Sequence, residues 1–106
     1  MDENIKRIES MEQRLNHADE ILTRLEAAMD EYEALLEDLR LLDAYLGSPE
    51  WHADRRADEL NQLPQDLQRG VLSEDGIWNL LERHHEALEQ MQEVLENIDK
   101  HQTDIL

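Results

Sequence analysis

The sequence contains no cysteine and no phenylalanine, and its 106 residues include only three glycines and two prolines. Without cysteine the chain can form no disulfide, no thiolate zinc site and no iron–sulfur cluster, and it has no thiol nucleophile. No apolar run approaches the roughly 20 residues of a membrane-spanning helix, and the N-terminal residues lack the apolar segment of a secretory signal. We therefore expect a cytoplasmic protein that contains no disulfide and no membrane segment.

Positive charge is also scarce, because ten Lys and Arg residues face 27 Asp and Glu residues, for a net charge of −17. The resulting field repels phosphate and anionic headgroups, so we expect no direct binding to nucleic acid or to a membrane surface. Apolar residues still make up 40% of the chain, which favours a folded protein over a disordered one. The length predicts a single domain over residues 1–106.

Residues 2–46 contain no glycine and no proline, and their apolar residues follow a seven-residue repeat over more than five heptads. The a positions are Ile8, Leu15, Leu22, Met29 and Leu36, and the d positions are Met11, Ala18, Leu25, Tyr32, Leu39 and Leu46. Such a repeat predicts one long helix that pairs with another helix. Gly47 is expected to stop this helix.

Residues 74–105 resume the repeat and predict a second long helix, with Ser73 as its N-cap. Both prolines lie in the connector of residues 47–73. There Ser48 and Pro49 predict the start of a short helix, and Gly70 is expected to allow a positive φ. The predicted fold class is all-α, a long antiparallel helical hairpin of coiled-coil type with one or two short helices in the connector.

One flank of the predicted hairpin is apolar. In an antiparallel pair g positions face g positions, and these hold Ile21, Ala28, Leu35 and Leu42 on the first helix and Leu80, Ala87 and Val94 on the last. The connector can cover the strip near the turn with its apolar residues, which are Trp51, Leu60, Leu63, Leu67, Val71 and Leu72. The distal strip of Ile21, Ala28, Leu35, Ala87 and Val94 is expected to be covered by a second copy, which predicts a homodimer.

The histidines suggest a metal site only weakly. Glu82 and His85 form a Glu-x-x-His half-signature of di-iron bundles, but the chain has no second pair, and both residues fall on the exposed flank. His84 occupies a seam position, where a polar residue commonly fixes register or partner choice, and a pH switch is the alternative. We expect no catalytic residue, no metal and no cofactor.

The connector carries the one specific motif. Its residues run Tyr45-Leu46-Gly47-Ser48-Pro49-Glu50-Trp51 and then Leu63-Pro64-Gln65-Asp66-Leu67-Gln68-Arg69-Gly70-Val71-Leu72-Ser73-Glu74-Asp75-Gly76. This pattern resembles a small bacterial family of acidic all-helical proteins catalogued as a domain of unknown function. The resemblance implies the helix–connector–helix architecture and implies no activity, cofactor or substrate. Within the motif, Arg69 is expected to pair with Asp66 or with the acidic residues 54–59.

Two functions remain open. The first is a non-enzymatic interaction module that binds an unknown protein partner. Its candidate tip residues are Trp51, Asp54, Asp58, Asp66, Arg69 and Trp78. The alternative is an acidic mimic of nucleic acid that inhibits a basic DNA- or RNA-binding protein. Such a mimic needs negative charge spread along both long helices, as phosphates are spread along a nucleic acid. Net charges of −8 over residues 1–46, −2 over 47–73 and −7 over 74–106 are compatible with that distribution.

Overall fold

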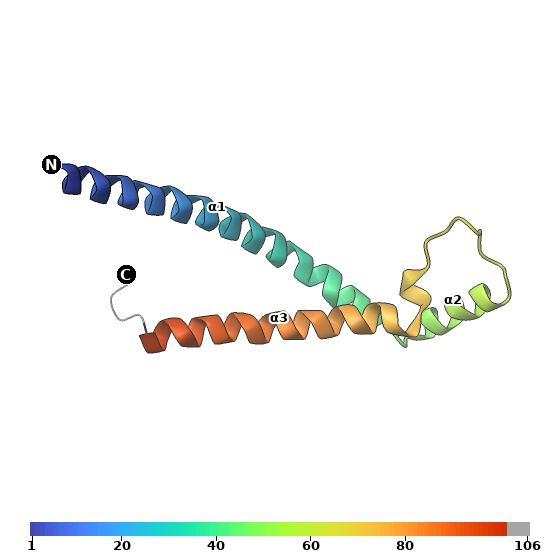
Figure 1. Cartoon of the computed structure of the whole chain (residues 1–106). Helices are drawn as coiled ribbons and strands as arrows, with labels where there is room; N and C mark the ends of the chain where they lie inside the picture. Colours follow the sequence, from blue (N-terminus) through green and yellow to red (C-terminus); the bar gives the residue numbers. More distant parts are fainter. Residues whose placement is uncertain (102–106) are drawn as a thin grey trace. The chain divides into compact units, whose positions relative to one another are not determined.

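The computed structural model describes residues 1–101, and every regular element in that range is helical. Helix α1 spans Asp2–Tyr45, α2 spans Pro49–Glu59, the 3-10 helix η1 spans Gly70–Leu72 and α3 spans Glu74–His101 (Figure 1). The all-α class predicted from the sequence is confirmed, as is a connector that contains short helices. The predicted end of the last helix, residues 102–105, lies outside the described residues.

Residues 1–38 form one compact unit, which consists of a single uninterrupted stretch of α1. The absence of glycine and proline keeps the helix continuous. Asp2 and Glu3 lie in the first turn, where their charge stabilises the positive end of the helix dipole. All 44 residues of α1 correspond to about 66 Å. No residue of this unit is buried, so its apolar stripe is a surface that another helix can cover.

Gly47 ends α1, as the sequence predicts. Its φ of +78° lies in the left-handed region, which glycine adopts without strain. Ser48 then caps α2, because its Oγ accepts a hydrogen bond from the backbone N–H of Trp51 at 3.1 Å. Pro49 occupies the first turn, where a missing N–H costs no hydrogen bond. These local signals place the start of α2 at the predicted position.

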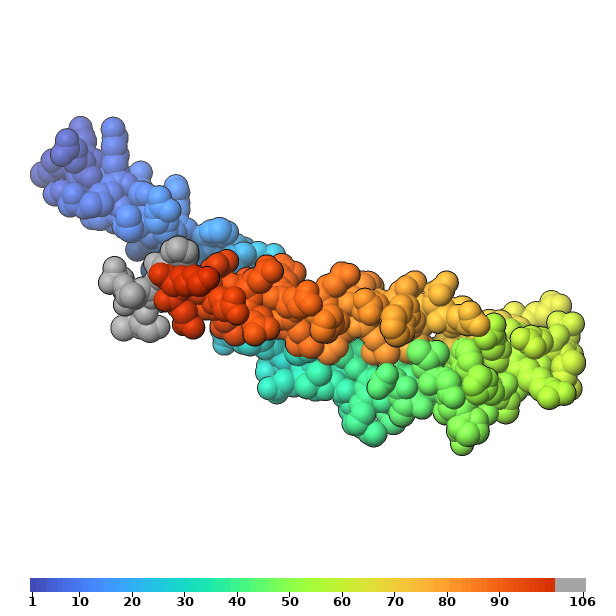
Figure 2. Space-filling model, turned by 90° about the horizontal axis from the view of Figure 1, so that it is seen from below, coloured from blue at the N-terminus to red at the C-terminus, as the bar shows by residue number. Residues whose placement is uncertain are grey.

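Residues from Leu39 onward form the second compact unit, and the core of the described chain lies there. Each of its elements contributes one buried side chain, namely Leu39 from α1, Trp51 from α2, Leu72 from η1 and Ile77 from α3. The space-filling view shows the connector, in green to yellow, continuous with the first turns of α3 (Figure 2). Within this unit the last turns of α1 and the first turns of α3 run in opposite directions, as a hairpin requires (Figure 1).

Two expectations about the connector were wrong. Gly70 does not adopt a positive φ, and the left-handed residue after α2 is instead Asn61, with a φ of 57°. The expectation that the apolar residues of the connector pack back is wrong for Leu60 and Leu67, which remain 57% and 49% exposed. Of the connector's apolar residues Leu72 is buried with Trp51, so the end of α2 and the following loop project outward (Figure 1).

Candidate functional site

Trp51 organises the connector. Its side chain is only 5% exposed, and its Nε1–H donates a hydrogen bond to the backbone carbonyl of Val71 at 2.9 Å. This bond ties the first turn of α2 to η1, twenty residues further along the chain. The sequence predicted Trp51 as a candidate interaction residue, and the structure places it in the core of the connector.

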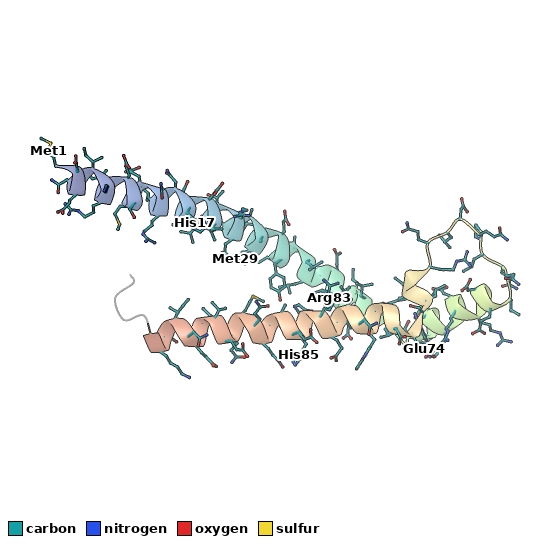
Figure 3. All side chains as sticks on the ribbon, viewed as in Figure 1. Met1, His17, Met29, Glu74, Arg83 and His85 are labelled. Carbon is teal, nitrogen blue, oxygen red and sulfur yellow. The ribbon has the colours of Figure 1, made fainter. Side chains whose placement is uncertain are left out.

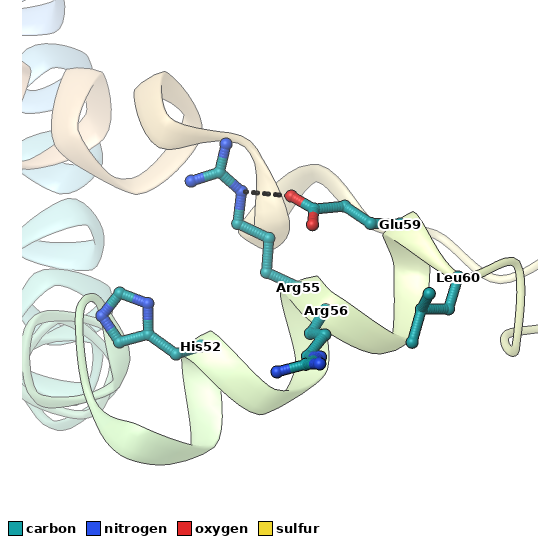
Figure 4. Close-up of a pocket in the computed structure, with 5 residues that line it drawn as sticks. All are labelled: His52, Arg55, Arg56, Glu59 and Leu60. Atoms are coloured by element: carbon teal, nitrogen blue, oxygen red, sulfur yellow. Dashed lines mark ion pairs between the residues drawn. The ribbon is translucent and has the colours of Figure 1, made fainter.

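Arg55 links α2 to α3 beside that tryptophan. Its guanidinium carbon lies 5.2 Å from the centroid of the Trp51 ring, a distance at which cation–π attraction operates. Its Nη1 pairs with Glu74 Oε1 at 2.9 Å. Its Nε lies 3.9 Å from Glu59 Oε1 (Figure 4). Because both carboxylates are exposed, each pair contributes less than about 1 kcal/mol. The pair with Glu74 holds the side of α2 against the first turn of α3.

Arg69 fastens the loop that follows α2. It forms an ion pair with Asp58 and donates a hydrogen bond to the backbone carbonyl of Pro64. Its Nε donates a further bond to the carbonyl of Leu67 at 3.3 Å. Pairing of Arg69 with the acidic residues of α2 is therefore confirmed for Asp58. Asp66, the other partner considered, is exposed.

Tyr45 makes a contact that the sequence did not predict. Its hydroxyl donates a hydrogen bond to Asp54 Oδ2 at 2.6 Å and so connects the end of α1 to α2. This hydrogen bond, together with desolvation and the negative charge of Asp54, raises the pKa of Tyr45 from 10.0 to about 12. Asp54, a predicted tip residue, is thus occupied within the chain.

The raised pKa of Tyr45 predicts an alkaline loss of stability. The protonated phenol is the form that donates to Asp54, so its stabilising effect is complete below pH 10.0 and is lost as the pH rises through about 12. Tyr45→Phe should lower the free energy of unfolding by about 1 kcal/mol at neutral pH, and this difference should vanish at high pH. Phenolate absorbance of the wild type and the variant measures the titration. Ionisation of Tyr45 near its ordinary pKa would contradict the contact.

Two of the recesses on the second unit are lined by residues of the connector. The first is a polar cavity of about 480 Å³ lined by His52, Arg55, Arg56, Glu59 and Leu60 (Figure 4). The second is a mainly apolar cavity of about 430 Å³ lined by Leu42, Gln68, Gly70, Val71, Gly76, Ile77 and Leu80. The polar cavity gathers three nitrogen-rich side chains on an otherwise acidic protein, and such groups bind carboxylates well. The apolar one has the chemistry to receive an aliphatic side chain.

The remaining predicted residues occupy exposed positions. Trp78 is 55% exposed on α3, and all five residues of the predicted dimer strip, Ile21, Ala28, Leu35, Ala87 and Val94, are exposed. His85 projects from α3 and pairs with Glu89 at 3.1 Å, whereas His84 is half-buried. Among the described residues, no three His, Asp or Glu side chains are grouped to hold a metal ion. The role of His84 in the seam stays a prediction.

Together these features define an acidic all-helical protein whose connector is assembled around one tryptophan. Residues 8–94 match the family described as Domain of unknown function (DUF4298), and the chain belongs to that family. The match includes the whole connector and confirms the resemblance inferred from it. No curated protein and no solved structure matches the chain significantly. No helix within residues 1–101 has an apolar stretch long enough to cross a lipid bilayer.

Proposed function

We propose that this chain is a non-enzymatic protein–protein interaction module, which self-associates along its long helices and presents its connector to a protein partner. The exposed apolar repeat of α1 is the observation that carries the proposal. Leu22, Leu25 and Met29 follow heptad spacing, and each is more than half exposed. Apolar surface of this extent gains free energy when another protein covers it. We also propose that the module acts in the cytoplasm, as expected from the sequence.

The dimer strip supports a second copy as one of the partners. Pairing of two helices through a and d positions leaves the g flank open, so Leu35 on α1 and Val94 on α3 need a further surface. They are 42% and 51% exposed. A second copy offers the same strip and gives a symmetric four-helix arrangement, which is a common form of homodimer.

Self-association is tested by sedimentation equilibrium of the full chain over a range of concentrations. The weight-average mass should rise towards that of a dimer. Leu35→Asp should weaken the association about tenfold or more, because each copy loses one buried leucine worth about 1.5–3 kcal/mol. Ala34→Asp adds the same charge on the outward-facing neighbour and should have little effect. A mass that stays monomeric at every concentration would overturn the proposal.

An acidic face on α3 supports the alternative function, a mimic of nucleic acid. Glu82, Glu86, Glu89, Glu93 and Glu96 recur at intervals of three and four residues, so they share one face of the helix, and all are exposed. This spacing places a carboxylate about every 5 Å along the axis. A basic partner held by this face should be released steeply by salt, whereas a partner held by apolar contacts should be retained.

A further inference from the structure

The N-terminal turns of α1 carry an apolar stripe at a and d positions of the heptad repeat. Its residues are Ile8, Met11, Leu15 and Ala18, and we call it the N-terminal seam. Ile8 and Leu15 are 60% and 63% exposed. Figure 3 shows the side chains of α1 extending from the helix on all sides. We propose that a second copy of this chain covers the N-terminal seam and forms a parallel two-stranded coiled coil with it. This inference rests on the proposed self-association and specifies its location and direction.

Among the described residues, the length of α3 leaves the N-terminal seam without an intramolecular partner. The 28 described residues of α3 correspond to about 42 Å, whereas α1 has 44 residues and about 66 Å. Helix α3 starts beside the end of α1, because Leu42, Ile77 and Leu80 line one cavity. Wherever the first unit lies, these 28 residues can face at most about two thirds of α1. The turns beyond their reach are those of the N-terminal seam.

The flanks of the N-terminal seam are charged on both sides, which is typical of a two-stranded coiled coil. Arg7 and Arg14 occupy g positions, and Glu12 and Asp19 occupy e positions. Within the described chain neither arginine forms an ion pair, and Arg7 donates a hydrogen bond to the neutral side chain of Asn4 at 2.9 Å. All four charges are therefore available to another helix.

The sequence of these charges favours a second copy in the parallel direction. In a parallel pair each g residue lies beside the e residue five positions later on the partner, so Arg7 meets Glu12 and Arg14 meets Asp19. Twofold symmetry repeats both pairs. In an antiparallel pair e faces e and g faces g, which sets acid against acid and arginine against arginine. Orientation is therefore encoded by charge complementarity.

The flank changes character where the seam ends. From Ile21 onward the g positions become apolar, with Ala28 and Leu35 following, and the stripe becomes wide enough to contact more than one helix. Net charge changes at the same point. Residues 4–18 contain three basic and two acidic side chains, whereas residues 19–39 contain one basic and eight acidic ones. Two copies of this acidic chain therefore repel each other less along the N-terminal seam than along residues 19–39.

The absence of cysteine makes the proposal testable by cross-linking of the full chain. Met11→Cys at a d position places two thiols across a parallel, in-register seam, within reach of a disulfide. Gln13→Cys lies on the outward face two residues away and is the matched control. Under mild oxidation Met11→Cys should form the covalent dimer about tenfold faster than Gln13→Cys. The oligomeric state of the unmodified chain is measured separately by sedimentation.

The outcomes separate this inference from the proposed function. Equal cross-linking of the two variants in a chain that sediments as a dimer overturns the parallel N-terminal seam and leaves self-association standing. A chain that sediments as a monomer at every concentration overturns both. Preferential cross-linking of Met11→Cys in a dimeric chain supports both.

Charge exchange provides a second test without a thiol. Arg7→Glu with Arg14→Glu should weaken association about tenfold, because attraction becomes repulsion at four symmetric pairs. Adding Glu12→Arg and Asp19→Arg recreates opposite charges at the original net charge of −17 and should restore association. The control, Arg24→Glu with Arg83→Glu, changes net charge equally away from the seam and should have a smaller effect. Failure of the fourfold exchange to restore association contradicts the proposed pairing.

Discussion

Trp51→Ala is expected to destabilise the connector by about 3–5 kcal/mol, the usual cost of removing a large buried aromatic side chain. Trp51 is the largest of the four buried side chains, and its loss leaves a cavity between α2 and η1. It also removes the hydrogen bond to the carbonyl of Val71 and the ring beneath Arg55. Backbone amides of η1 and the first turn of α3 should then exchange with solvent about a hundredfold faster or more.

The other tryptophan is the matched control for this prediction. Trp78 lies on α3 in the same unit but is 55% exposed, so Trp78→Ala should change the stability by about 1 kcal/mol or less. Trp51→Phe should be intermediate, because it keeps much of the ring but loses the indole N–H donor. Amide exchange and tryptic cleavage after Arg69 measure all three variants. Equal effects of the two alanine changes would contradict the central position of Trp51.

The elements that the sequence predicts correctly are those determined by neighbouring residues. The heptad repeat of α1 is visible without any tertiary contact. The stop at Gly47, the N-cap at Ser48 and the cap at Ser73 each depend on residues one to three positions away. Ser73 Oγ accepts a hydrogen bond from the N–H of Gly76 at 3.0 Å, as an N-cap should. Features that depend on such short-range interactions can be predicted from the order of residues alone.

Contacts within the connector are different, because an acidic chain offers each cation several equivalent partners. Arg69 had four carboxylates in its vicinity, and only the fold selects Asp58. The hydrogen bond from Tyr45 to Asp54 links two helices whose relative placement depends on the turn at Gly47. The Trp51 N–H donates to a backbone carbonyl, and because every residue has such a carbonyl, the sequence does not indicate which one accepts. A weak signal existed only for Arg55, four residues after Trp51 on the same helical face.

The position of the left-handed residue in the connector was also not predictable from the sequence. Gly70 invites the expectation of a left-handed turn, yet Asn61 is the residue that adopts one. Asparagine tolerates this conformation better than other side chains. Since Pro64 also stops any helix in this stretch, the chain can turn at several residues. Two contacts then hold the far end of the loop against α2, the hydrogen bond from Trp51 to Val71 and the ion pair of Arg69 with Asp58.

Gly76→Ala is expected to destabilise the connector, against the preference of helices for alanine. Gly76 lies in the first turn of α3, and substitution at an exposed helical position would normally gain about 1 kcal/mol. Here a Cβ at residue 76 would lie 2.4 Å from the carbonyl oxygen of Gly70 and 2.8 Å from Ser73 Oγ. These two atoms are already hydrogen-bonded to each other at 2.9 Å. Because the nearest atom belongs to the backbone, relief requires η1 to move.

We expect a net loss of about 1–3 kcal/mol from this overpacking, measured as a lower urea midpoint with an unchanged slope. Gly70→Ala is the matched control in the same motif, because a Cβ there meets no heavy atom within 4 Å and φ is not left-handed. It should be neutral or stabilising by up to about 1 kcal/mol, through reduced freedom of the unfolded chain. Opposite signs for the two glycines would establish the close approach of η1 to α3. Stabilisation by both substitutions would show that η1 does not approach the first turn of α3 this closely.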